Sequence, residues 1–487
     1  MKIVHISDLH FHESTDGVAT RYRHSLACLK DIERLLDEHK PTHLAVTGDI
    51  TNIGDKLSLE RAYQWIHDQI YSDGDYYGLH SVKRGLTPLI VPGNHDAFNA
   101  PTTGSEFKRW QSSLSNFYGV FHQYSWKDAD NGVMYRWHED DSGVAVLFCS
   151  VDSCYLGDPE TERLGATLSL ERIAKGRLSR RQSASVLALF DKGMAGELDK
   201  IDGAKIPSGK FLAALKVLVM HHYLFEPANS RAEPLLQMSQ KRTVFQNLAM
   251  SDFDVLICGH KHIADIHVST YSDNFDRRGK IRLAFNYVRR VLGIRSLPLG
   301  IDGDGRRLSK ALRLIIGLLA ITKTKGRPLD DATTNEIIGV LERSLKNPIV
   351  LKEELLNYLS TQDENGQAGL FDETEMRELY SKIKERFDRN DRRSLNEAAD
   401  RIRGIISHLS GRPFAHIMSA SSAKSSEDGT RHRAVNVYDI VGAQGDAGYL
   451  FKTTRFSWDP QVHRFVQAFQ QDVVFPRSRG LHTAGEA

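Results

Sequence analysis

The chain has 487 residues, which exceeds one typical domain and predicts either two domains or one large domain with an insertion. Hydrophobic residues make up 40% and charged residues 26% of it, the composition of an ordinary soluble globular protein. The 64 Lys and Arg residues nearly balance the 62 Asp and Glu residues, which gives a net charge of +2. This excludes an overall electrostatic attraction to nucleic acid or to anionic membranes, so any basic patch must be local.

Short apolar runs alternate with helical patterns through the first part of the chain. The patterns predict strands at 2–7, 43–47, 87–91, 144–151, 217–220 and 255–258, and helices at 20–39 and 57–71. This alternation predicts an α/β protein in which helices cover a layered sheet. Sharp turns follow three of the strands directly, at Gly48-Asp49, Gly93-Asn94 and Gly259-His260. Reactive groups in α/β sheets lie at such carboxyl ends of strands.

The pattern changes to a mainly helical block over residues 275–410, and strand patterns return at 433–440, 448–456 and 461–469. We predict four segments: a catalytic domain at 1–274, a helical insertion at 275–410, closing strands of the catalytic domain at 411–472, and a tail at 473–487. A separate C-terminal domain with its own small sheet is the alternative. The Ser-rich stretch 419–431 is predicted to be a mobile loop.

The compartment and the relation to membranes are predicted from what the sequence lacks. Four cysteines without a C-x-x-C pair argue against a disulfide framework and favour a reducing compartment. The N-terminal residues show no charged-then-apolar signal pattern, and the longest apolar run, 312–321, is too short to cross a bilayer. We therefore expect a cytoplasmic protein without a transmembrane segment.

Five polar blocks follow predicted strands and combine carboxylate, amide and imidazole groups. They are Asp8-x-His10, Gly48-Asp49, Gly93-Asn94-His95-Asp96, His221-His222 and Gly259-His260-Lys261-His262. Mn²⁺, Zn²⁺, Fe²⁺ and Ni²⁺ all accept this mixture of ligands. Because alternate residues of an extended segment point the same way, Asp8 and His10 can share one metal, and His260 and His262 can both face the site with Lys261 turned away.

A pair of divalent cations about 3.5–4 Å apart would hold a hydroxide between them and polarise a phosphoryl oxygen. Metal coordination lowers the pKa of water from about 15.7 to about 7, so the hydroxide becomes a nucleophile near neutral pH. In-line attack on phosphorus would then expel an alkoxide.

The five blocks, in this order over residues 8–262, resemble the calcineurin-like metallophosphoesterases, and so do the flanking residues 5–10, 47–52 and 92–96. The resemblance implies a four-layer fold of two mixed β-sheets flanked by helices. It implies one metal site made by Asp8, His10, Asp49 and His262, and a second made by Asn94, His221 and His260, with Asp49 bridging. His95 would stabilise or protonate the leaving-group oxygen, and Asp96 would tune His95. The likeness extends to a helix after Leu178, with Ser179 as its N-cap.

The motifs are most similar to those of bacterial class III cyclic-nucleotide and glycerophosphodiester phosphodiesterases. We therefore expect a phosphodiesterase on a nucleotide or another small phosphodiester, with two divalent metals: Mn²⁺ (favoured for activity), Fe²⁺/Fe³⁺, Zn²⁺ or Ni²⁺. The alternatives are a nuclease of the same superfamily and a metal-binding subunit of a multiprotein system, such as a defence system.

Four points stay open in the sequence. His222 competes with His221 as ligand, and residues 222–227 depart from the family pattern, so the substrate is not transferable. Residues 271–313 contain eleven Lys and Arg but only four Asp and Glu residues. This excess of positive charge fits either a segment that binds nucleic acid or a solvent-exposed basic collar. The helical block is interpreted as a lid, a homo-oligomer arm or a site for a protein partner.

Overall fold

The computed structural model places the chain in two units, residues 1–268 with 413–477, and residues 269–412 with 478–487. It describes residues 1–11, 26–72, 74–97, 114–122, 132–154, 176–226, 238, 244, 252–270, 413–422, 433–443 and 448–476. The predicted helical insertion at 275–410 and the basic segment 271–313 lie outside the described residues. The first unit carries all five polar blocks.

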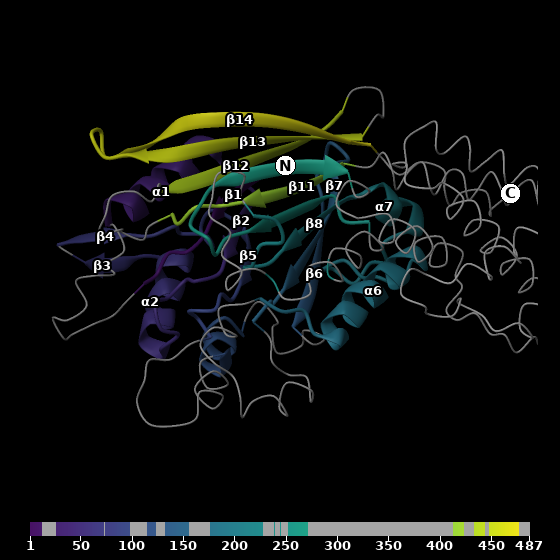
Figure 1. Ribbon diagram of the computed structural model, residues 1–487, viewed down its shortest axis with the longest axis horizontal. Coiled ribbons are helices and arrows are strands. Elements are labelled where there is room, and N and C mark those ends of the chain that lie inside the picture. The colour runs from purple at the N-terminus through teal and green to yellow at the C-terminus, as the bar shows by residue number, and fades with distance from the viewer. Residues whose placement is uncertain are drawn as a thin grey trace, which may run out of the picture. The chain divides into compact units, whose positions relative to one another are not determined.

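Two six-stranded sheets form the centre of this unit (Figure 1). The first has the order β14-β13-β12-β1-β2-β5 and the second the order β10-β11-β9-β8-β7-β6. The first sheet consists of β1 (Lys2–Ile6), β2 (His43–Thr47), β5 (Thr87–Val91), β12 (Ala434–Gly442), β13 (Gly448–Asp459) and β14 (Arg464–Pro476). The second consists of β6 (Val133–Glu139), β7 (Ala145–Val151), β8 (Leu215–Val219), β9 (Val255–Cys258), β10 (Asp265–Thr270) and β11 (Pro413–Met418). Strands β3 (Ile70–Ser72) and β4 (Asp75–Tyr77) form a separate hairpin.

Both sheets are mixed. In the first, β1, β2 and β5 are parallel, while β12 pairs antiparallel with β1 and begins an antiparallel run through β13 to β14. In the second, β7, β8, β9 and β11 are parallel, and β6 is antiparallel to β7. Strands β2, β7, β8 and β9 are buried along their whole length, as expected for parallel strands covered on both faces. This arrangement confirms the predicted fold of two mixed sheets with flanking helices.

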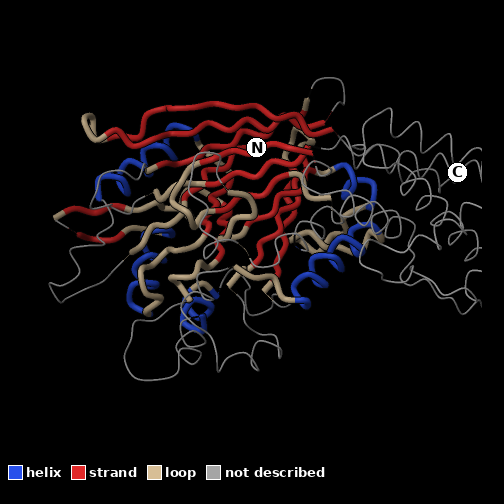
Figure 2. Tube along the Cα trace, viewed as in Figure 1, coloured by secondary structure: helices blue, strands red, loops and turns tan. Residues whose placement is uncertain are grey.

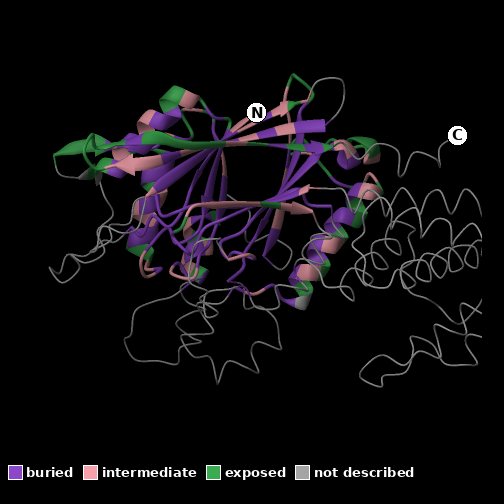
Figure 3. Cartoon of the chain, turned by 45° about the horizontal axis from the view of Figure 1, so that its top comes forward, coloured by how far each residue is buried: buried purple, intermediate pink, exposed green. Residues whose placement is uncertain are grey.

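Helices cover the sheets on their outer sides (Figures 1 and 2). Helices α1 (Leu26–His39) and α2 (Lys56–His67) accompany the first sheet, and α6 (Arg180–Met194) and α7 (Ser208–Ala213) accompany the second. One continuous core joins apolar residues of both sheets with those of α1 and α2, such as Ile32 and Trp65. Figure 3 shows the buried residues concentrated in the strands between these helices.

The chain leaves the second sheet through β10 and returns to it through the neighbouring strand β11. Strands β12 to β14 then complete the first sheet, so that the last described residues pair within the sheet that holds the first strand of the chain. Strand β14 ends at Pro476, which carries it four residues into the segment predicted as a tail. Helix α2 ends at His67, and residues 70–72, of which the first two were predicted to continue this helix, instead form β3.

Among the described residues, none of the helices combines the length and the apolarity that a bilayer crossing requires.

Candidate metal centre

The polar blocks converge because the parallel strands of each sheet end at the same edge. Asp8 and His10 follow β1, Asp49 follows β2, and Asn94 follows β5 in the first sheet. His221 follows β8 of the second sheet, and His260 and His262 follow β9. The structure thus brings all seven predicted ligands to one place, although they come from two sheets.

The first cluster contains Asp8, His10, Asp49 and His262. Each side chain is buried, and one ligand atom from each lies within 4.8 Å of the others. The Nε2 atoms of His10 and His262 are 3.3 Å apart, and His262 Nε2 lies 3.1 Å from Oδ1 of Asp8. Two imidazole nitrogens this close repel each other through their lone pairs unless a proton or a cation lies between them.

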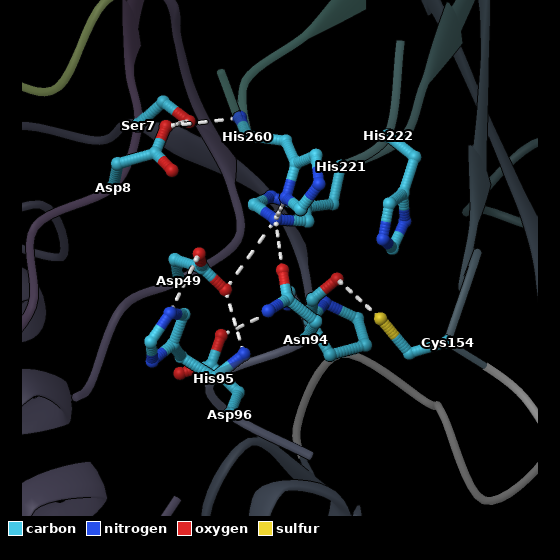
Figure 4. A network of polar contacts seen from close by, with 12 residues as sticks. Ser7, Asp8, Asp49, Asn94, His95, Asp96, Cys154, His221, His222 and His260 are labelled. Carbon is cyan, nitrogen blue, oxygen red and sulfur yellow. Dashed lines mark hydrogen bonds and ion pairs between the residues drawn. The ribbon is translucent and has the colours of Figure 1, made fainter. Parts of the chain in front are cut away.

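The second cluster is centred on Nε2 of His221 (Figure 4). This atom lies 3.0 Å from Nδ1 of His260, 3.1 Å from Oδ1 of Asn94 and 3.4 Å from Oδ1 of Asp49. Nδ1 of His221 donates to the backbone carbonyl of Thr47 at 2.6 Å, which leaves Nε2 to face the cluster. Asp49 therefore contributes to both clusters, as a bridging carboxylate would.

His222 also lies near the second cluster, with a ligand atom within 4.8 Å of those of His221 and His260. Its Nδ1 contacts the Ser153 hydroxyl at 2.8 Å, and its ring lies beside that of His260 with a centroid distance of 4.5 Å. Figure 4 shows it on the side of Cys154, away from Asn94 and Asp49. The geometry therefore favours His221 as the residue that meets Asn94 and Asp49, and places His222 in the wall of the site.

The donor set fits two divalent cations. It offers imidazole nitrogens, two carboxylates and one amide oxygen, the mixture that first-row transition metals accept. Nε2 of His260 is fully buried and has no hydrogen-bond partner in the described part of the chain. Buried polar atoms are normally paired, so this orphaned nitrogen marks a site that is incomplete as a purely protein structure.

The electrostatics show where positive charge is required. Burial by itself would raise the pKa of Asp49, but the imidazoles of His221, His95 and His10 outweigh it and hold that pKa well below its usual range. Burial would lower the pKa of His221, yet Asp49 and Asp8 raise it to about 9. The two buried carboxylates thus demand a cation beside them, which a divalent metal supplies better than a proton.

His95 sits at the edge of the first cluster and is the more exposed of the candidate catalytic residues, with 35% of its side chain accessible. Its Nδ1 contacts the backbone carbonyl of Asn52 at 2.9 Å and must therefore carry a proton. Nε2 points to the site, 4.0 Å from Oδ2 of Asp49. The backbone N–H of His95 donates to Oδ1 of Asp49 at 2.8 Å, which helps to fix that carboxylate.

Asp96 does not contact the His95 imidazole, contrary to the expected tuning role. Its carboxylate accepts hydrogen bonds from the N–H groups of Ile50, Thr51 and Gly93 at 2.8–3.1 Å and from the Thr51 hydroxyl at 2.9 Å. Burial and then Asp49 raise its pKa to about 6. Asp96 therefore holds the loops after β2 and β5 together, and the partner that orients His95 is a backbone carbonyl.

The glycines of the motifs lie where the backbone of one strand end comes very close to atoms of another. Gly48 has a φ of +82°, and a Cβ there would lie 2.6 Å from both Gly93 N and His221 Nδ1. A Cβ on Gly93 would lie 2.2 Å from the Asp49 backbone nitrogen and 2.2 Å from its Oδ1. Gly259 approaches the Ser7 hydroxyl in the same way. Only glycine lets the strand ends pack closely enough for their ligands to meet.

Several supporting residues were not predicted from the sequence. Ser7 donates to Oδ2 of Asp8 at 2.5 Å, and Ser421 donates to the Asp8 carbonyl at 2.6 Å. Lys261 was expected to turn away; it is buried and pairs with Glu226 at 2.5 Å, and Glu226 also accepts from the Tyr223 hydroxyl. Serine, lysine and glutamate are common polar residues, and nothing in their local sequence indicates which partners their side chains will meet.

The family model described as calcineurin-like phosphoesterase matches residues 1–264. No curated protein matches the chain. Among solved structures, the chain is similar to the purple acid phosphatase from yellow lupin (Lupinus luteus) seeds, with 12% sequence identity and a TM-score of 0.32. That match covers 55% of this chain and 38% of the lupin chain.

Proposed function

The chain belongs to the calcineurin-like phosphoesterases and is a metal-dependent phosphoester hydrolase, and within that class we propose that it is a phosphodiesterase acting on a nucleotide or another small phosphodiester. The observation that carries the proposal is the pair of donor clusters that share Asp49 at the common edge of two sheets. The preference for a diester is supported by residues 3–52 and 93–96, which resemble the motifs of bacterial cyclic-nucleotide and glycerophosphodiester phosphodiesterases.

The residues divide into two cation positions. Asp8, His10, Asp49 and His262 would hold one divalent cation, and Asn94, His221 and His260 would hold the other with Asp49 between them. We propose Mn²⁺ as the activating metal. When bound, two such cations supply an activated water molecule and Lewis acidity at a phosphoryl oxygen.

His95 would act on the leaving group. Its Nδ1 proton is committed to the Asn52 carbonyl, so it donates a proton from Nε2 only as the imidazolium. Oδ2 of Asp49 lies 4.0 Å from this Nε2. A partly exposed imidazolium beside a buried metal-binding cluster suits protonation of an alkoxide as it departs from phosphorus.

The proposal is tested with metal-free protein reconstituted with Mn²⁺. It would be offered bis-p-nitrophenyl phosphate, p-nitrophenyl phosphate, 3′,5′-cyclic nucleotides, and labelled single- and double-stranded DNA. We expect two equivalents of Mn²⁺ to bind, and we expect hydrolysis of the small diesters to exceed hydrolysis of the monoester. The Asp49→Ala protein is the control, and it should lose paired metal binding and activity together.

Three results would contradict the proposal. Degradation of DNA at low enzyme concentration, with cyclic nucleotides untouched, would make the protein a nuclease. Hydrolysis of the monoester alone would make it a phosphomonoesterase. Full activity of the Asp49→Ala protein would contradict the two-metal assignment itself.

A further inference from the structure

Residues Ser419–Ser422 lie directly after β11 and pack against the turn that carries Asp8 and His10. All four are buried, with exposures of 0–3%. Ser419 N donates to the Cys258 carbonyl at 2.9 Å, which anchors the segment to the end of β9. This stretch begins the Ser-rich segment predicted to be a mobile loop, and its first four residues are instead part of the site's surroundings.

Two serines of this segment hold the backbone of the β1 turn. The Ser421 hydroxyl donates to the backbone carbonyl of Asp8 at 2.6 Å, across 413 positions of sequence. Ser422 N donates to the Ser7 carbonyl at 2.9 Å, and the Ser7 N–H donates to the Ser422 hydroxyl at 3.2 Å. The Ser422 hydroxyl in turn donates to the Ala434 carbonyl at 3.0 Å, at the start of β12.

The turn held by these bonds is conformationally demanding. Asp8 and His10 both have a φ of +53°, in the left-handed region that non-glycine residues seldom occupy. Their N–H groups donate to the carbonyls of Gly48 and Asp49, each at 3.0 Å. The Asp8 carbonyl belongs to the next peptide of the turn, and Ser421 is the residue that donates to it.

We propose that Ser421 is a positioning residue for the first cation position, because it fixes the peptide between Asp8 and Leu9. The inference rests on the proposed two-metal function and deepens it. The orientation of this peptide determines where the Asp8 carboxylate and the His10 imidazole project. Without the hydroxyl, a buried carbonyl loses a donor and the strained turn gains freedom to relax. Groups that orient metal ligands typically change metal affinity by about 10–100-fold when removed.

The test is Mn²⁺ binding to metal-free Ser421→Ala protein, measured by calorimetric titration together with the rate of metal loss to a chelator. We expect one of the two equivalents to bind about 10-fold or more weakly, and the other to bind as in the wild type. Ser419→Ala is the matched control, since the Ser419 hydroxyl donates to the carbonyl of its neighbour Ala420. This control should bind both equivalents normally.

Ser421→Cys replaces the hydroxyl with a somewhat larger thiol that remains a weak donor, and it carries the test if the alanine protein does not fold. We expect the cysteine protein to bind the weakened equivalent with intermediate affinity. Unchanged binding of both equivalents by a folded Ser421→Ala or Ser421→Cys protein would overturn the proposal, and so would an equal loss in Ser419→Ala. If the wild type itself failed to bind two equivalents, the proposed function would fail first, and the two failures are thereby distinguished.

Discussion

Five of the seven candidate ligands have left-handed backbone conformations. They are Asp8, His10, Asp49, His260 and His262, with φ between 49° and 77°. Each such residue costs on the order of 1–3 kcal/mol, and such residues persist only where the surrounding structure enforces them. The hydrogen bonds between neighbouring turns provide that enforcement at Asp8 and His10. At the residue scale, stability is given up so that side chains from separate strands can meet at one point.

This strain leads to a prediction for His262, whose φ is 58°. Both His262→Gly and His262→Ala should lose the first cation, because both remove the imidazole. In metal-free protein, however, the glycine variant should be more stable to urea than the alanine variant, by about 1 kcal/mol, because glycine adopts positive φ without a Cβ penalty. Equal urea midpoints for the two variants would contradict the strain at this position.

His95 gives a second prediction at this scale. His95→Ala should lower kcat by about 10²–10⁴-fold, the usual range for loss of a general acid, while both Mn²⁺ equivalents remain bound. Metal content and kcat would be measured on the same preparation. Loss of a metal together with activity would show that His95 is a ligand and not a leaving-group acid.

The polar blocks could be located in the sequence because each follows an apolar strand at a short spacing, while the assignment of their residues as metal ligands comes from the family resemblance and stays a prediction. The role of Asp96 was not predicted correctly. Its neighbour in sequence is His95, but its carboxylate turns to the backbone of Ile50 and Thr51, 46 and 45 positions away. Ser421 was missed for the same reason. Contacts between the ends of different strands depend on which strands become neighbours, and local pattern does not encode that.

At the scale of elements, helix α6 shows how a local signal supports the site. Ser179 accepts from Gln182 N at 3.0 Å, and the Gln182 side chain accepts from Ser179 N at 2.9 Å, a complete capping box that confirms the predicted N-cap. The same Gln182 side chain donates to the Asp152 carbonyl at 2.6 Å. The cap therefore links α6 to the loop after β7, where Ser153 contacts His222.

Replacing the cap residue should destabilise this connection. Ser179→Ala should lower the free energy of unfolding by about 1 kcal/mol, because it leaves a helix-terminal N–H without its acceptor. Ser183→Ala, one turn into the same helix, is the matched control and should change stability by about 0.5 kcal/mol or less. Urea denaturation measures both, and equal losses in the two proteins would contradict a capping role.

Elements with strong local patterns were predicted closely, and weakly patterned ones were not. The strands at 43–47, 87–91 and 255–258 are observed with the predicted bounds, because they are short, largely apolar runs that end in turns. Strands β6 and β10 escaped prediction because much of their surface is only partly buried and their sequences lack a clean alternation. Between β12 and β13, Ala443 N donates to the Gly448 carbonyl at 2.9 Å.

Across the whole unit, histidines are also used as neutral core residues. His43 and His416 are buried, and neither belongs to the candidate metal ligands. Burial, together with His138, Arg136 and the N-terminus, lowers the pKa of His43 to about 3. Burial, together with His267, lowers the pKa of His416 to about 3. In the unfolded chain both would titrate near their usual value of about 6.5.

These shifts set the sign of a pH dependence. Well above a pH of about 6.5 both histidines are neutral in either state, and their contribution to the stability of the fold is complete. Between about pH 6.5 and 3 these two histidines are protonated in the unfolded chain but stay neutral in the folded protein, so the free energy of unfolding falls as the pH falls. We expect a lower urea midpoint at about pH 5 than at about pH 7.5, and a smaller difference in His43→Leu. The same pH dependence in wild type and variant would contradict a neutral buried His43.

The central position of β1 in the first sheet also sets an order of assembly. Its partner on one side is β2, but its partner on the other is β12, and His5 meets Tyr438 across 433 positions of sequence. At a synthesis rate of about 5–20 residues per second, the second partner emerges some 20–90 seconds after the first strand. During that interval β1 exposes an open edge, and the Asp8 turn lacks Ser421. A growing chain therefore passes through a state in which Ser421 does not yet fix the Asp8 turn and the open edge of the N-terminal strand needs protection from pairing with other chains.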